Sequence, residues 1–490
     1  MEYIDKLKMA FKNTVVYKSP RQTSFFKDLG LPSYLRDWVV KKYSDENGMI
    51  DMEMVSSKIK SILPRKEDWV AIKDYLINEG GTKKFIAKIS VDVDIRTDLI
   101  TFSLPDFGLF NSDTIIEKYI WDKYKTQLIS NRNDVWGIIE LQYVKIPIGK
   151  KLEVGKISLL SFQSFNPYRV DLEYYYSARS QFTTEEWINV LLGAIDYNPE
   201  GFKSKNEKLS LLTRLLPFVE KRLNLIELAP KGTGKSYVFS NISKTGWLIS
   251  GGTISRAKMF YDISRRQFGL VTNYDFIAMD EVQTIDFPDV NEMRGALKGY
   301  LESGRFTVAN MEGVGESGII LLGNISEHNM NVDINMFTEL PELFNESALI
   351  DRFHGFVKGW EMPRLSESMV ANGWALNTEY FSEVMHILRN EIQYRDIVEE
   401  LLEIPVNADK RDTEAIKRIC TAWLKLLFPH VKRASDIDIN EFRLYCLKPA
   451  LNMRSIIKTQ LGIIDTEFFG KLIPAITIKD KYLDGVNDEN

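Results

Sequence analysis

The sequence has few of the residues that mark a secreted or a zinc-binding protein. It contains 2 cysteines and 4 histidines among 490 residues. Two cysteines cannot build a disulfide framework, which favours a reducing compartment. We expect Cys420 and Cys446 to be small apolar residues of the core. His354 has no companions at ligand spacing, so we expect no zinc site.

Long apolar runs are also lacking. No stretch approaches the roughly 18 apolar residues of a membrane-spanning helix. The N-terminal segment MEYIDKLKMAFKN carries charge throughout and lacks the apolar part of a signal peptide. The net charge of −5 excludes a globally basic nucleic-acid binder but leaves room for a local basic patch. We therefore predict a cytoplasmic protein without a membrane partner.

The pattern of apolar residues divides the chain into four predicted parts. Residues 1–95 have helical spacing, and residues 96–209 alternate like the strands of a small OB-like β-module before a connecting helix. Residues 210–365 alternate strand and helix, as in an α/β core. Residues 366–490 return to helical patterning, which predicts a helical C-terminal lid with a polar tail.

The N-terminal region differs in charge from the whole chain. Residues 1–66 hold 13 lysines and arginines against 8 aspartates and glutamates. A basic patch for DNA is one interpretation, and a solvated helix face is the other.

The stretch IELAPKGTGKSYVFSNI predicts a buried strand, a tight turn and a helix. It matches the phosphate-binding pattern G-x-x-x-x-G-K-[ST], except that Ala229 replaces the first glycine. Lys235 would reach the β- and γ-phosphates, and the Ser236 hydroxyl would bind Mg²⁺, so we predict ATP and Mg²⁺ as cofactors. Backbone N–H groups of the loop would surround the phosphates. The predicted phosphate-binding residues are Lys231, Gly232, Thr233, Gly234, Lys235 and Ser236.

Two further apolar strands end on polar residues. YDFIAMDEV ends on Asp280, which we assign to the metal, and Glu281, which we assign as general base. GIILLGN ends on Asn324, which would position the attacking water. The three strand ends are about 45 residues apart, as expected when one strand separates the P-loop strand from the acidic strand. This order predicts an AAA+ P-loop ATPase core.

Arginines downstream offer further catalytic candidates. Arg352 follows a short helical run in ESALIDRFHGFVKGWEMP and is a candidate arginine finger that completes a neighbour's site, or else a surface ion-pair partner. Arg389 is a candidate lid arginine that contacts the γ-phosphate of its own chain, or else a solvated helix residue. The stretch LESGRFTVANMEGVGESG predicts a hairpin, with Arg305 and Lys298 as candidates for contact with a threaded polymer.

Several of these stretches together resemble BrxL, the Lon-like AAA+ ATPase family of BREX phage-exclusion systems. They are ELAPKGTGKSYVFSNIS, WLISGGTISRAKMFY, YDFIAMDEV, LLGNIS, DRFHGFVKGWEMPRL and WALNTEYFSEVMHILR. The N-terminal stretches LPSYLRDWVVKKYS and FTTEEWINVLLGAI resemble that family too.

The resemblance implies an MCM-like core, a hexameric or double-hexameric ring around double-stranded DNA, and defence against phage replication. It places Arg352 at the finger position and Asn324 at the first sensor. Longer members carry a C-terminal Lon-protease-like domain with a Ser/Lys dyad. Here about 120 helical residues follow the core, so we do not expect protease activity.

We therefore predict an ATP-driven ring that binds or encircles DNA as a translocase or helicase-like motor, with other phage-defence proteins as further partners. One alternative is a protein-unfolding ring, although the glycines and aromatics of SGGTISRAKMFYD do not stand side by side as in a typical pore loop. The other is a slow nucleotide-gated switch that mainly binds partners.

Overall fold

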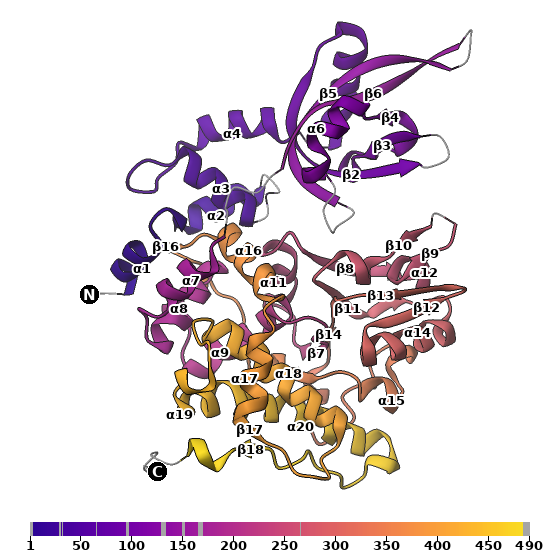
Figure 1. The fold of residues 1–490 in the computed structure, drawn as a ribbon. Coiled ribbons are helices and arrows are strands. Elements are labelled where there is room, and N and C mark those ends of the chain that lie inside the picture. Colours follow the sequence, from indigo (N-terminus) through magenta and orange to yellow (C-terminus); the bar gives the residue numbers. More distant parts are fainter. Residues whose placement is uncertain are drawn as a thin grey trace. The chain divides into compact units, whose positions relative to one another are not determined.

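The computed structural model describes residues 3–28, 31, 33–64, 66–94, 98–128, 134–148, 152–164, 170–264 and 266–483 (Figure 1). The chain forms two compact units. We call Met1–Lys41 together with Val170–Asn490 the large unit, and Lys42–Arg169 the inserted unit.

These boundaries differ from the four predicted parts. Strand β1 (Val15–Lys18) pairs antiparallel with β16 (Gly373–Leu376), which ties the first 41 residues to the C-terminal part of the large unit. Strand β2 (Lys83–Asp94) lies between β3 and β5 in the sheet of the inserted unit, so it belongs to the same sheet as the strands that follow residue 95. Pairing between strands more than 350 residues apart leaves no local pattern, and the sequence therefore did not predict it.

A five-stranded parallel sheet forms the centre of the large unit. Its order is β15-β7-β14-β11-β8. The third strand along this order, β14, lies between β7 and β11, which confirms that one strand separates the P-loop strand from the acidic strand. The sheet strands are β7 (Leu225–Ala229), β8 (Gly246–Thr253), β11 (Phe276–Asp286), β14 (Gly318–Asn324) and β15 (Gly355–Lys358).

Apolar residues fill these strands because both faces of the sheet are covered. All five residues of β7 are buried. One apolar cluster joins Ile226 of β7 to Leu297 of α14 (Val290–Ser303) and Ile457 of α20 (Lys448–Ile464). The sequence prediction of an α/β core is confirmed.

Other helices of the large unit surround this sheet and the short β1–β16 pair (Figure 1). Helix α8 begins after Thr183, whose side chain and Glu186 form a capping box. The described α-helices of this unit, besides α14 and α20, are α1 (Tyr3–Phe11), α2 (Pro20–Asp28), α3 (Ser33–Tyr43), α7 (Leu172–Arg179), α8 (Thr184–Ala194), α9 (Lys205–Leu212), α10 (Leu216–Val219), α11 (Lys235–Asn241), α12 (Arg256–Met259), α13 (Leu270–Asn273), α15 (Ser347–Ile350), α16 (Thr378–Leu388), α17 (Gln393–Leu401), α18 (Lys410–Leu427) and α19 (Ile439–Phe442).

The C-terminal helices α16 to α20 bury both cysteines. Cys420 on α18 and Cys446 are free thiols of the core, as predicted, and burial raises the pKa of each. Two short strands, β17 (Leu402–Glu403) and β18 (Thr477–Ile478), pair antiparallel in the same region. Among the described helices, none is long and apolar enough to cross a membrane.

The inserted unit is a second five-stranded sheet of order β3-β2-β5-β6-β4. All of its pairs are antiparallel except β4–β6. The outer strands β3 and β4 are also linked, because Ile116 N–H donates to the Ile100 carbonyl at 2.7 Å and the Thr114 hydroxyl donates to the Phe102 carbonyl. Its remaining elements are β3 (Leu99–Ser103), β4 (Thr114–Ile115), β5 (Asp134–Ile148), β6 (Leu152–Ser164), α4 (Met52–Ile62), α5 (Trp69–Asp74) and α6 (Lys118–Leu128).

Candidate nucleotide site

The loop from β7 to α11 has the backbone geometry that the phosphate-binding pattern requires. Gly232 and Gly234 have φ values of 86° and 74°, in the left-handed region that favours glycine. The Gly232 carbonyl accepts a hydrogen bond from Leu365 N–H at 3.1 Å. Within the loop Lys231 is exposed and Thr233 is buried. Helix α11 begins at Lys235, so its N-terminus faces the loop.

Ala229, which replaces the first glycine of the pattern, packs against a glycine of the neighbouring strand end. A Cβ added to Gly359, just after β15, would lie 2.2 Å from the Cβ of Ala229. The methyl group of Ala229 therefore occupies space that Gly359 leaves free. The two positions together carry one small side chain, which explains how alanine fits at the end of β7.

Three neighbouring strand ends bring the predicted catalytic residues together. Lys235 Nζ donates to Asn324 Oδ1 at 2.7 Å, and the Ser236 hydroxyl donates to the Asp280 carboxylate. Asn324 Nδ2 lies 3.5 Å from Glu281 Oε1. The carboxyl ends of parallel strands meet at one edge of a sheet, where ligands bind in open α/β folds.

The electrostatics of this edge suit an anion and a divalent cation. Asp280 is buried, whereas Glu281 is exposed to solvent. Burial lowers the pKa of Lys235, and the nearby carboxylate of Glu227 opposes that shift. The Ser236 hydroxyl and the Asp280 carboxylate are hard oxygen donors. Mg²⁺ is typically bound through one or two such groups together with phosphate oxygens, so these residues fit the predicted ion.

Glu281 has an unusual backbone conformation. Its φ of 48° lies in the left-handed region, which costs a non-glycine residue about 1 kcal/mol or more. Hydrogen bonds hold this conformation, because Glu281 N–H donates to Asp280 Oδ1 at 3.0 Å and the Glu281 carbonyl accepts from the Thr284 hydroxyl at 2.8 Å. Backbone outliers of this kind cluster at functional sites.

The sequence analysis missed a buried ion pair behind the P-loop. Arg214 is 1% exposed and donates from Nε and Nη2 to the Glu227 carboxylate at 2.9 and 2.6 Å. Its Nη1 also donates to the Thr233 carbonyl at 2.7 Å, so the pair holds the backbone of the loop. A glutamate inside the apolar stretch LIELA was the available signal, because a buried carboxylate needs a partner.

The prediction for Arg389 is wrong. Its side chain donates to the carbonyls of Glu220 at 3.1 Å and Glu316 at 2.8 Å, and it lies 3.5 Å from Asp275. Asp275 and Glu316 precede β11 and β14, so Arg389 lies at the amino edge of the sheet, opposite the P-loop. With 5% exposure it is not a solvated helix residue either. The direction in which α16 crosses the sheet determines which edge of the sheet Arg389 reaches. Sequence spacing does not reveal that direction.

Arg352 makes contacts within its own chain. Its Nε lies 2.9 Å from Glu302 Oε2 on α14, and Nη1 donates to the Ala348 carbonyl on α15. A finger role requires a neighbouring subunit, so it stays a prediction.

The predicted hairpin is confirmed as β12 (Arg305–Val308) paired with β13 (Met311–Val314). Arg305 is exposed at its start. Lys298, the second candidate for contact with a threaded polymer, lies on α14 rather than on the hairpin, and it pairs with Glu346.

Comparison with known proteins supports the resemblance seen in the sequence. The family described as "Lon-like protease BrxL-like, ATPase domain" matches residues 157–473, and "BREX system Lon protease-like protein BrxL N-terminal" matches residues 9–143. The Lon-like protease BrxL of Escherichia coli O9:H4 (strain HS) is 29% identical over 448 residues, which are 90% of this chain and 62% of that protein.

The Lon-like protease BrxL of Bacillus cereus (strain H3081.97) is 30% identical over 456 residues, which are 90% of this chain and 64% of that protein. The chain thus spans less than two thirds of the length of these relatives. The ATPase-domain match covers the whole parallel sheet and the P-loop. The chain therefore belongs to the BrxL-like family of the BREX system and contains its ATPase domain.

Proposed function

We propose that the chain is an ATP-hydrolysing AAA+ ring protein that binds or encircles double-stranded DNA and acts as a translocase or helicase-like motor in BREX-type phage defence. The observation that best supports this proposal is that Lys235, Asp280 and Asn324 lie together at one edge of the parallel sheet. We place it in the cytoplasm as a hexamer or double hexamer, with other phage-defence proteins as further partners.

The residues at this edge divide the chemistry among them. Lys235 would pair with the phosphates, and Ser236 and Asp280 would hold Mg²⁺, which would supply positive charge to the phosphate oxygens. Glu281 takes the proton of the attacking water. Asn324 lies within hydrogen-bond distance of Lys235 and 3.5 Å from Glu281, so its amide orients that water between base and phosphate.

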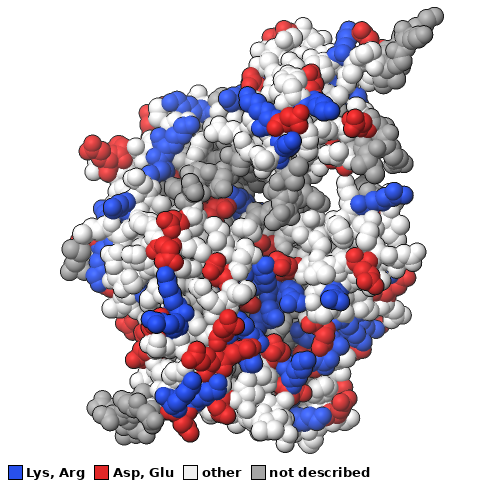
Figure 2. Space-filling view, in the orientation of Figure 1, with Lys and Arg blue, Asp and Glu red and all other residues white. Residues whose placement is uncertain are grey.

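Contact with DNA is proposed for both units. The strand order of the inserted unit, with β3 and β4 linked, fits the five-stranded OB-like barrel that commonly binds nucleic acids. In the large unit the exposed Arg305 begins the β12–β13 hairpin. On the face that Figure 2 shows, lysine and arginine are interspersed with acidic residues, so local basic contacts would bind the phosphates there.

The two relatives are named Lon-like proteases. We propose ATP hydrolysis rather than peptide hydrolysis for this chain, because residues 366–483 form mainly the helices α16 to α20. We propose that these helices form the lid.

The test is ATP turnover measured with increasing amounts of duplex DNA or of an unfolded protein. We expect DNA to stimulate turnover. DNA affinity should fall steeply between about 50 and 200 mM salt, since phosphate contacts release counterions. Stimulation by unfolded protein alone would contradict the proposal and favour the unfolding ring. If neither duplex DNA nor unfolded protein changes ATP turnover, the result would favour the nucleotide-gated switch.

A pair of variants localises the DNA contact. Arg305→Ala should keep the basal turnover and lose most of the DNA stimulation. Lys298→Ala is the matched control, because Lys298 pairs with Glu346 on the surface, where an ion pair contributes about 0–1 kcal/mol. Equal stimulation of both variants would remove Arg305 from the proposed DNA contact.

A further inference from the structure

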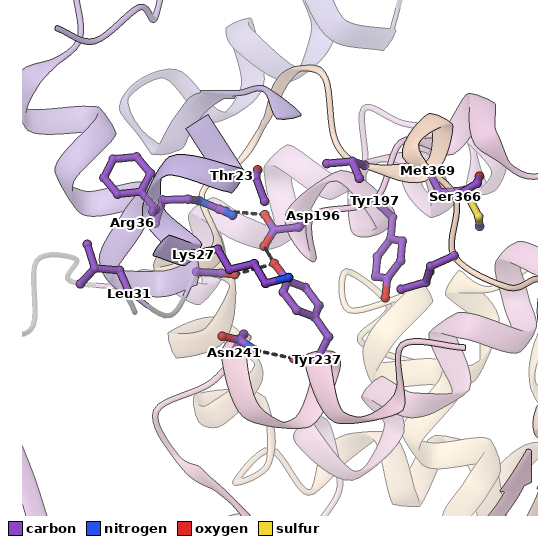
Figure 3. A pocket seen from close by; sticks show the side chains of 14 residues that line it. Thr23, Lys27, Leu31, Arg36, Asp196, Tyr197, Tyr237, Asn241, Ser366 and Met369 are labelled. Carbon is purple, nitrogen blue, oxygen red and sulfur yellow. Dashed lines mark hydrogen bonds and ion pairs between the residues drawn. The ribbon is translucent and has the colours of Figure 1, made fainter. Parts of the chain in front are cut away.

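The P-loop helix and the proposed arginine finger are held by charge contacts of different kinds. Tyr237 of the P-loop helix α11 donates to Asp196 at 2.6 Å, and Asp196 also accepts from Arg36 of α3 (Figure 3). The side chains of Asp196 and Arg36 are 3% and 5% exposed. Breaking a buried ion pair is strongly destabilising, so the position of α11 is fixed in the fold.

The contact of Arg352, the proposed finger, lies nearer the surface. Its Nε is 2.9 Å from Glu302 Oε2 near the end of α14, and the two side chains are 16% and 47% exposed. This nitrogen makes no hydrogen bond, so its attraction to the carboxylate is electrostatic alone. Partly exposed ion pairs contribute little to stability. Arg352 can therefore leave Glu302 at a small cost in free energy.

Glu302 has a second cationic partner. Arg411 on α18 donates from Nε to Glu302 Oε2 at 3.2 Å, and its Nη1 donates to Asp351 Oδ2 at 2.9 Å. Asp351 precedes Arg352 in the chain and pairs with Arg454 of α20 at 2.6 Å. When Arg352 leaves, Arg411 continues to compensate the charge of Glu302. The carboxylate can thus hold and release Arg352 without becoming an unpaired charge.

Glu302 is also joined directly to the β12–β13 hairpin, the proposed DNA contact of the large unit. Only Ser303 and Gly304 separate it from Arg305. Gly304 ends α14 with a φ of 77°, and its carbonyl accepts from the N–H of Gly315, just past β13, at 2.9 Å. Both arms of the hairpin thus converge on the last turn of α14, so a displacement of the hairpin moves Glu302.

We propose that Glu302 is a positioning residue that holds Arg352 within its own subunit, and that duplex DNA bound at the β12–β13 hairpin releases Arg352 toward the nucleotide of the neighbouring subunit. This inference rests on the proposed function, in which Arg352 completes the neighbour's site. Without DNA, the contact with Glu302 lowers the fraction of subunits whose Arg352 is available, and turnover is slow. DNA raises turnover by shifting this population.

ATP turnover of Glu302→Gln, with and without duplex DNA, tests the inference. Glutamine keeps the shape of the side chain but removes its charge. We expect turnover without DNA to rise about two- to fivefold, as for the loss of one partly exposed ion pair. The DNA stimulation should fall by the same factor, and the KM for ATP should change less than about twofold, because Glu302 does not contact the nucleotide.

Glu292→Gln is the matched control, because Glu292 lies on the same helix, is 51% exposed and pairs with Arg256 at 2.6 Å. It should hydrolyse ATP as the wild type does. Unchanged or slower turnover by Glu302→Gln without DNA would overturn the inference, as would a DNA stimulation equal to that of the wild type.

A double variant shows whether Glu302 acts through Arg352. In the Arg352→Ala background, Glu302→Gln should leave the residual turnover unchanged. A rise of about two- to fivefold in that background would overturn the inference, since Glu302 would then act by another route. Failure of the proposed function is distinguishable, because the wild type would then show no DNA-stimulated turnover, or Arg352→Ala would hydrolyse ATP normally.

Discussion

Single residues around the P-loop show how one departure from a motif is accommodated. Ala229 stands where the phosphate-binding pattern has glycine, and Gly359 leaves the space that its methyl group needs. A Cβ at Gly359 would also lie 2.9 Å from the Leu228 carbonyl. The pattern at residues 229–236 therefore depends on a residue more than 120 positions away.

This dependence predicts the effect of a small substitution. Gly359→Ala should lower the free energy of unfolding by about 1–3 kcal/mol, the usual cost of overpacking a core, and should reduce ATP affinity because the end of β7 is displaced. Ala229→Gly added to it should recover part of both losses, since it removes the methyl group in conflict. Urea unfolding and ATP titration measure these effects. Additive losses in the double variant would contradict the proposed contact.

Sequence reasoning at this scale succeeded where a motif and a strand end coincide. Lys235, Asp280 and Asn324 follow apolar runs that read clearly as strands, and they meet as predicted. The failure at Arg389 has a different origin, because its place depends on how α16 crosses the sheet. The backbone of Glu281, with φ 48°, also has no signature in the sequence.

Among the elements, α16 carries an unusual buried charge. Glu379 is completely buried and lies 2.9 Å from Lys244, which also pairs with Glu383 at 2.6 Å. Burial raises the pKa of Glu379 to about 7, Lys244 opposes this shift, and Glu383 and Asp37 add to it. The folded protein therefore binds a proton on Glu379 at a pH where the unfolded chain has lost it.

The sign of the resulting pH dependence follows directly. Because the folded pKa is above the ordinary value of 4.5, the contribution of protonated Glu379 is complete below pH 4.5 and is lost as the pH rises toward 7. Glu379→Gln cannot ionise, so its unfolding free energy should gain up to about 3 kcal/mol relative to the wild type over this range. Urea unfolding across the pH range measures this. If the unfolding free energies of the wild type and Glu379→Gln followed parallel curves against pH, the result would contradict this prediction. The control variant is Glu185→Gln, because Glu185 is exposed.

The order of the sheet was predictable, whereas the pairing of β1 with β16 was not. The regular spacing of the three strand ends indicated that β14 lies between β7 and β11. The β1–β16 pair joins short segments that lack a distinctive pattern of their own. The sequence also did not show that residues 1–41 and 42–95 belong to different units.

For the whole molecule, the proposed ring makes each site depend on two subunits. In this proposal one subunit would supply Glu281 and its neighbour would supply Arg352, whose Nε here lies 2.9 Å from Glu302 of its own chain. Arg352→Ala should bind ATP but hydrolyse it at least about 10³-fold more slowly, as is typical when an arginine finger is removed.

Mixing two inactive variants tests this arrangement. In mixed rings of Arg352→Ala and Glu281→Gln, some sites combine an intact Glu281 with an intact Arg352, so part of the turnover should return. Each variant alone should remain inactive. Absence of any recovery in mixed rings, or normal turnover by Arg352→Ala, would contradict completion of the site by a neighbour.

The central claim is that Lys235 and Glu281 act on one magnesium-bound triphosphate at the carboxyl edge of the sheet. The most direct test measures ATP binding and hydrolysis by the wild type, Lys235→Ala and Glu281→Gln in the presence of Mg²⁺. We predict that Lys235→Ala loses binding, and that Glu281→Gln binds ATP normally while turnover falls about 10²- to 10⁴-fold. A wild type that neither binds nor cleaves ATP, or a Glu281→Gln variant with normal turnover, would contradict it.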